Sequence, residues 1–146
     1  MENPPFAKSF CDLVVYQKQR ALALAIFRRS KLFPPEERYA LTDQVRRASR
    51  SIGAQIAESW AKRRFEKHFI AKLTDADAEC HETEHWLKSA KDCEYLSEEE
   101  CRSLVSQCEE IGRMLGSMIE NACKFCPQTS MIREDPTDLC LLPSDL

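Results

Sequence analysis

The sequence predicts an all-α protein, namely an antiparallel up-down-up-down four-helix bundle with a flexible C-terminal tail. Glycine is scarce, with 3 among 146 residues, and residues of high helix propensity are abundant. Apolar residues recur every three or four positions over long segments, which is typical of helices that pack along one face. Short links between these segments favour antiparallel neighbours. We expect one domain, with the bundle at residues 1–126 and an extended or disordered tail at residues 127–146.

The first helix is expected from about Lys8 to Arg29. The Phe-Pro-Pro segment at residues 33–35 should separate it from the second helix, because proline fits the first turn of a helix but not its interior. The apolar positions that we expect on this helix are Phe10, Leu13, Val14, Ala21, Leu24 and Ala25.

The second helix is expected to run to about Ala61, where the basic segment at residues 62–64 marks a corner. Its apolar residues follow a 4-3-4-4 spacing, which implies a partner helix. This stripe consists of Leu41, Val45, Ala48, Ile52 and Ile56.

The third and fourth helices show the most regular pattern, alternating steps of four and three as in a bundle seam. The third is expected at about residues 65–93, and the fourth from a capping box of Ser97 and Glu100 to about Lys124. The third seam consists of Phe69, Leu73, Ala76, Cys80, Thr83, Leu87 and Ala90, and the fourth of Leu104, Cys108, Ile111, Leu115, Met118 and Ala122.

Beyond Pro127 the periodicity stops, and two further prolines interrupt the tail. The apolar segment at residues 139–142 either docks on a neighbour or belongs to a solvated terminus.

Charge is unevenly distributed along the chain, although the net charge is only −3. Residues 1–72 hold 15 basic and 7 acidic residues, a balance of +8, whereas residues 73–146 hold 6 and 17, a balance of −11. This asymmetry indicates either a basic surface for nucleic acid or a head-to-tail contact between subunits.

No segment reaches the roughly 18 consecutive apolar residues of a membrane helix, and no signal peptide is visible. We therefore expect a cytoplasmic protein without a membrane partner. In a reducing compartment the 8 cysteines are expected to be thiols, several of them buried as small hydrophobic residues.

Two short motifs resemble metal sites. His81-Glu82-Thr83-Glu84-His85 matches the H-E-x-x-H pattern of zinc hydrolases, but the only other histidine is His68, and the seam assignment turns both histidines away from the core. Cys123-Lys124-Phe125-Cys126 is a single C-x-x-C pair without a second pair at workable spacing. We expect no cofactor, no structural metal and no enzymatic activity, with a zinc hydrolase as the remote third interpretation.

The basic residues of the second helix and the corner after it are the remaining functional signal. Arginine pairs bidentately with phosphate, so the cluster favours contact with a nucleic-acid backbone. No aromatic residues are interleaved with these arginines, so the sequence gives no indication of base stacking. Alternatives are a solvated basic face, pairing with acids across a subunit interface, or Arg46 tied to Glu58 or Glu82 inside the bundle. The candidate nucleic-acid-binding residues are Arg46, Arg47, Arg50, Lys62, Arg63, Arg64 and Lys67, with Lys18, Arg20, Arg28 and Arg29 contributing from the first helix.

Several segments together resemble one protein family. Residues 44–58, QVRRASRSIGAQIAE, resemble the signature Q-x-R-R-A-x-x-S-I-x-x-N-I-A-E-G of the small four-helix-bundle proteins encoded in intervening sequences of bacterial 23S ribosomal RNA genes. Residues 10–17, 33–41 and 82–90 resemble other segments of that family. Two residues depart from the signature: Gln55 replaces asparagine and Ser59 replaces glycine.

The resemblance implies a homopentamer of bundles. The family is similar in fold to the accessory variability protein of diversity-generating retroelements. By analogy, that similarity implies a partnership with a reverse transcriptase or another nucleic-acid enzyme. The predicted function is a non-enzymatic oligomer that binds RNA or DNA backbone with weak sequence specificity. The alternative is a purely structural or protein-binding oligomeric scaffold.

Overall fold

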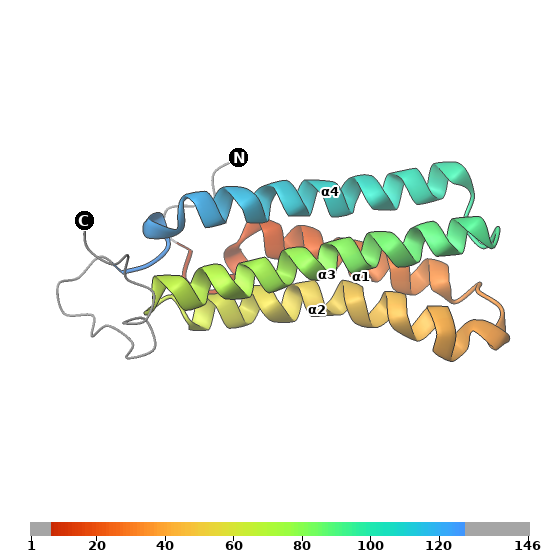
Figure 1. Cartoon of the computed structure of the whole chain (residues 1–146), viewed down its shortest axis with the longest axis horizontal. Helices are drawn as coiled ribbons and strands as arrows, with labels where there is room; N and C mark the ends of the chain where they lie inside the picture. The colour runs from red at the N-terminus through yellow and green to blue at the C-terminus, as the bar shows by residue number, and fades with distance from the viewer. Residues whose placement is uncertain (1–6, 128–146) are drawn as a thin grey trace, which may run out of the picture.

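A computed structural model describes residues 7–127, and within them it contains four long α-helices and no strand. Figure 1 shows the four helices along one axis, with consecutive helices running in opposite directions. The helices are α1 (Val14–Ser30), α2 (Asp43–Ala61), α3 (Glu66–Asp92) and α4 (Glu98–Glu120). Helix α2 packs most extensively on α3, and α1 closes the ring against α4. The all-α bundle predicted from the sequence is confirmed.

The seams predicted for α2, α3 and α4 form the core. Every residue of these three predicted stripes is buried. Their regular spacing keeps each stripe on one side of its helix, so packing that side inwards removes the apolar side chains of the stripe from water.

The apolar positions predicted for the first helix are only partly confirmed. Leu13 is fully buried, and Phe10, Val14 and Ala25 are half-buried. The structure exposes Ala21 and leaves Leu24 46 % exposed. This helix carries alanine and leucine on most of its sides, so apolar periodicity alone does not select the buried one. The residues of α1 that are buried are Val15, Gln19, Leu22, Ile26 and Ser30.

The helix ends also differ from the prediction. Residues Phe10–Asp12 form a separate 3₁₀ turn capped by Ser9, and Leu13 is extended, so α1 begins at Val14 rather than Lys8. A 3₁₀ turn at Pro35–Glu37 and a π-helical turn at Arg38–Thr42 precede α2. Helix α4 ends at Glu120, and the 3₁₀ turn Ala122–Lys124 follows. The predicted tail lies, apart from Pro127, outside the described residues.

The predicted capping box of α4 is present. The backbone N–H of Glu100 donates to Ser97 Oγ at 3.0 Å, and the Ser97 N–H donates to Glu100 Oε2 at 3.1 Å. The same carboxylate accepts from Arg29 of α1 at 2.8 Å. These contacts, led by the Arg29 hydrogen bond, lower the pKa of Glu100 from its ordinary value of 4.5.

We expect Glu100→Gln to destabilise the protein at neutral pH and to lose this effect in acid. Because the pKa of Glu100 is lower in the folded protein, its stabilising contribution is complete above the unfolded-state pKa and disappears as pH falls through the folded-state value. Glutamine still caps Ser97, so the substitution isolates the charge. Denaturant melts of both proteins across pH 2–7 should converge at the acidic end; a constant difference would contradict the assignment.

None of the helices described is long and apolar enough to cross a membrane.

Candidate nucleic-acid interface

Three arginines of α2 lie together on its outer side. Arg46, Arg47 and Arg50 share a hollow of about 460 Å³ with Asp43, Ser51 and Ala54. The α2 stripe turns Val45, Ala48 and Ile52 into the core. Arg47 and Arg50 are exposed, and Arg46 is half-buried. Within residues 7–127, no carboxylate forms an ion pair with any of the three arginines.

Arg46 is oriented by α1. Its Nε donates to Ser30 Oγ at 2.8 Å, and Ser30 Oγ donates in turn to the Phe27 carbonyl at 3.0 Å. The predicted alternative that ties Arg46 to Glu58 or Glu82 is wrong. Glu58 pairs with Lys72 at 3.0 Å, and Glu82 is exposed and accepts from the Trp86 indole.

Three cationic side chains lie close to one aromatic ring. The charged groups of Lys31, Arg46 and Arg50 lie 4.7, 4.9 and 5.6 Å from the centre of the Phe27 ring. Attraction to the ring face offsets part of the repulsion between these cations and orients them. Phe27 was not predicted as part of this cluster, because in the sequence it stands nineteen residues before Arg46. The Pro-Pro link between the two helices was the feature that could have indicated this contact, because it folds the end of α1 back along α2.

Two basic residues assigned to this set from the first helix belong elsewhere. Lys18 pairs with Glu110 and Arg29 with Glu100, each at 2.8 Å, so both face α4. Arg20 lies over the Tyr16 ring and donates to its hydroxyl at 3.3 Å, which raises the pKa of Arg20. Arg28 is exposed.

The corner between α2 and α3 is a second, separate basic region. It contains Lys62, Arg63, Arg64 and Lys67, and its first residue lies about 18 Å along the helix axis from Arg50. Arg63 stacks on Trp60 at 3.4 Å and donates to the Trp60 carbonyl at 2.9 Å, and burial lowers its pKa. Arg63 therefore caps the end of α2, whereas Lys62, Arg64 and Lys67 are exposed.

The two departures from the family signature lie away from the arginine cluster. Ser59 is fully buried and donates to the Ile56 carbonyl at 2.6 Å. Gln55 accepts from Lys72 of α3 at 3.4 Å, beside the Lys72–Glu58 ion pair.

The H-E-x-x-H histidines are on the outside of α3. His81 Nδ1 lies 2.9 Å from the Asp77 carbonyl, and this hydrogen bond raises the pKa of His81. His85 is exposed and packs edge-on against Trp86 at 4.7 Å. Within residues 7–127, no three metal-ligating side chains converge. Nothing in this arrangement favours the zinc-hydrolase interpretation.

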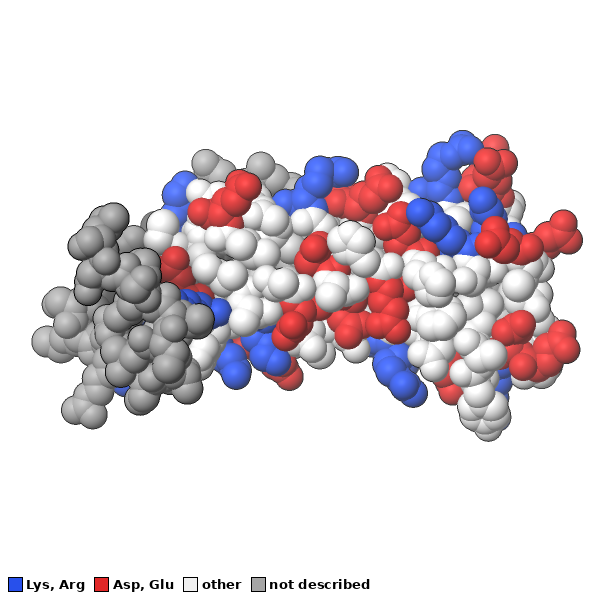
Figure 2. Space-filling model, in the orientation of Figure 1, with Lys and Arg blue, Asp and Glu red and all other residues white. Residues whose placement is uncertain are grey.

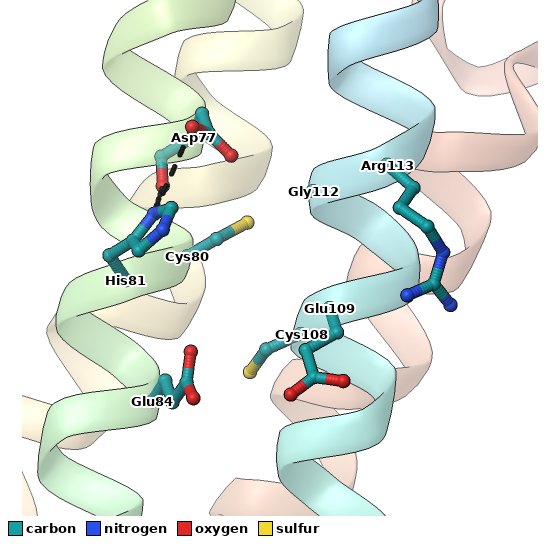
Figure 3. A pocket seen from close by; sticks show the side chains of 8 residues that line it. All are labelled: Asp77, Cys80, His81, Glu84, Cys108, Glu109, Gly112 and Arg113. Atoms are coloured by element: carbon teal, nitrogen blue, oxygen red, sulfur yellow. Dashed lines mark hydrogen bonds and ion pairs between the residues drawn. The ribbon is translucent and has the colours of Figure 1, made fainter.

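A second hollow, of about 340 Å³, lies between α3 and α4 and is acidic (Figure 3). Asp77, Glu84 and Glu109 line it, with Arg113 at its edge, so it does not suit phosphate. Cys80 and Cys108 line its buried side, and burial raises the pKa of both thiols, that of Cys108 to about 12. They are therefore protonated at neutral pH and poorly suited to nucleophilic or metal chemistry. No disulfide joins Cys123 and Cys126, and burial raises the pKa of Cys126 to about 11.

The sequence pattern of one family, described as 23S rRNA-intervening sequence protein, matches residues 11–117. The chain belongs to this family. The resemblance seen in its motifs is thereby confirmed. A similar solved structure is that of a protein of unknown function from the S23 ribosomal protein family of Bacteroides thetaiotaomicron. That protein is 32 % identical, the match covers 73 % of this chain and 99 % of the other, and the TM-score is 0.66. No curated protein matches the chain.

Proposed function

We propose that this family member is a non-enzymatic, cytoplasmic oligomer that binds the phosphate backbone of RNA or DNA through Arg46, Arg47 and Arg50. The single observation that supports the proposal is which basic side chains of the bundle have an acidic partner and which do not. Lys18, Arg29 and Lys72 are neutralised by acids of other elements, whereas the three arginines on the outer side of α2 have no carboxylate partner within the described chain.

Phosphate is the anion that suits this arrangement. A guanidinium offers paired N–H donors that match two phosphate oxygens, and contacts of this kind position a protein without reading bases. Arg46 is held by Ser30 and Phe27, so less side-chain freedom is lost when it binds. We expect Lys62, Arg64 and Lys67 at the corner to contact phosphates further along the same strand.

Self-association would multiply this surface. The family resemblance implies five copies, and several linked sites bind one polyanion far more tightly than a single site does. Binding of this kind is salt-sensitive and weakly sequence-specific. An accessory role beside a nucleic-acid enzyme such as a reverse transcriptase fits these properties.

The decisive experiment reverses the three charges. We expect Arg46→Glu/Arg47→Glu/Arg50→Glu to bind a random-sequence single-stranded RNA at least about tenfold more weakly at 50 mM salt, with the slope of log affinity against log salt reduced by about 2 per protomer. Fluorescence anisotropy measures the affinity, light scattering the oligomer and circular dichroism the fold.

The control variant is Lys91→Glu/Arg102→Glu/Arg113→Glu, which makes the same charge change on exposed positions of α3 and α4. It should bind RNA more tightly than the α2 variant. Equal losses in both variants would mean that only net charge matters. Unchanged RNA binding together with a dissociated oligomer would refute the proposal in favour of the structural scaffold.

A structural scaffold is the second candidate, and one observation favours it. Acidic side chains gather along the middle of the face formed by α3 and α4 (Figure 2), and Asp77, Glu84 and Glu109 border a hollow there. In a head-to-tail assembly, this acidic face of one copy would receive the arginines of the next.

A further inference from the structure

An open apolar groove runs between α1 and α2. It has a volume of about 560 Å³, and its lining includes Tyr16, Ala21, Leu24, Phe27, Gly53 and Ala54. Leu24 is 46 % exposed, one of the few large apolar side chains of the described chain that water reaches so freely. Small residues on both helices leave this groove unfilled, so an apolar ligand would gain contact with both walls.

The rim of the groove is basic. Arg20 stands on the α1 side and Arg50 on the α2 side. The π-face of Tyr16 and that of Phe27 attract these guanidiniums, but within residues 7–127 neither arginine forms an ion pair with a carboxylate. The groove therefore suits a short apolar segment that carries acidic residues beside it.

The chain itself contains such a segment beyond the described residues. The sequence Asp-Leu-Cys-Leu-Leu at residues 138–142 joins an acid to four apolar residues, and Asp145 follows. Residues 128–146 hold one basic and four acidic residues, a balance of −3. The part of the chain that matches the family ends at residue 117, so this segment lies beyond it. The residues that line the groove all lie within the matched part, except Phe10.

The distance along the chain is sufficient. Helix α4 ends at the end of the bundle where α1 begins, and α1 packs directly on α4 (Figure 1). From Pro127 to Leu139 there are 12 residues, which reach about 40 Å when extended. The groove extends only about 17 Å along α1 from Tyr16 to Phe27, and a helix is about 10 Å across.

We propose that residues 138–146 dock in the α1/α2 groove of their own chain, with Leu139, Leu141 and Leu142 against its apolar floor and the neighbouring aspartates toward Arg20 and Arg50. Arg50 lines both this groove and the arginine hollow. The docked segment would therefore compete with phosphate for Arg50, a consequence that rests on the proposed function, whereas the docking itself does not.

Cys140 makes the proposal directly testable by cross-linking in the full-length chain. All variants carry Cys11→Ser, Cys93→Ser and Cys123→Ser, which remove the exposed thiols of the described residues. Leu24→Cys then places a thiol in the groove, and mild oxidation should join it to Cys140 within one chain. Docking raises the effective concentration of the two thiols, so we expect this cross-link to form at least about tenfold faster than in an undocked control.

The matched control is Ser106→Cys, an exposed position near the middle of α4. Rates are normalised to the reactivity of each introduced thiol with a small disulfide reagent, because Arg20 and Arg50 favour the thiolate near the groove. Adding Leu141→Asp and Leu142→Asp to the Leu24→Cys variant should reduce its rate to that of the control.

Peptide mapping and denaturing gels identify the product. A monomer-sized product that joins Cys140 to the thiol at position 24 supports the proposal. Equal normalised rates for Leu24→Cys and Ser106→Cys overturn it, and so does a rate that the two aspartates leave unchanged. A dimer-sized product would assign the groove to the segment of a second copy instead. None of these outcomes depends on RNA binding, so docking and the proposed function can fail separately.

Discussion

Phe69→Ala is expected to lower the free energy of unfolding by about 3–5 kcal/mol. Phe69 is fully buried near the start of α3, and its ring stacks on Phe125 at a centroid distance of 5.8 Å. Removing the ring leaves a cavity beneath the turn that follows α4, where the backbone of α3 prevents full collapse. Denaturation in urea followed by circular dichroism measures the loss as a lower midpoint at unchanged slope.

Phe65→Ala is the matched control, because Phe65 is half-buried and lies one turn earlier. It should cost clearly less than Phe69→Ala. If the alanine variant does not fold, Phe69→Leu should still fold and lose about 1.5 kcal/mol or less. Equal losses at positions 65 and 69 would contradict the burial assigned to α3.

Gly53→Ala is expected to lower the free energy of unfolding by about 2 kcal/mol, although alanine is the better helix former by about 1 kcal/mol. A Cβ at this position would meet the side-chain amide of buried Gln19, whose three terminal atoms all lie within 3.0 Å of it. The amide would have to move, and Gln19 Nε2 would lose its 2.9 Å hydrogen bond to the Ser49 carbonyl. A buried donor without a partner costs about 1–3 kcal/mol.

Two comparisons isolate that contact. In a Gln19→Ala background the clash is absent, so Gly53→Ala should become neutral or stabilising by up to about 1 kcal/mol. Gly116→Ala in α4 should stabilise the wild-type protein, because nothing lies within 4 Å of a Cβ there. A Gly53→Ala loss of the same size with and without Gln19 would show that the contact is not its cause.

The accuracy of the sequence prediction followed the regularity of the pattern. The α3 seam from Phe69 to Ala90 was predicted in full, because its steps of three and four admit one helical face. The alanine- and leucine-rich α1 admits several faces, and only its packing selects Val15, Leu22 and Ile26 for the core. Gln19 was missed because a polar residue gives no apolar signal, yet the glycine beside it on α2 makes room for it.

The basic cluster was found, but its members were not separated by environment. Arg46, Arg47 and Arg50 were identified from one helix, since residues three or four apart share a face. Lys18 and Arg29 were grouped with them because the sequence does not show which side of α1 meets α4. Phe27 was missed because it comes nineteen residues before Arg46 in the chain and beside it only in the fold.

By itself the sequence determined the number of helices, three of the four core faces, the capping box at Ser97 and the family. Those features depend on residues a few positions apart, whose geometry within a helix is constant. The tertiary structure alone decided which cations are neutralised, where the apolar groove lies and why a side chain at position 53 would collide with Gln19. These depend on the rotation and axial offset of one helix against another, which are set by how side chains from distant parts of the chain interlock.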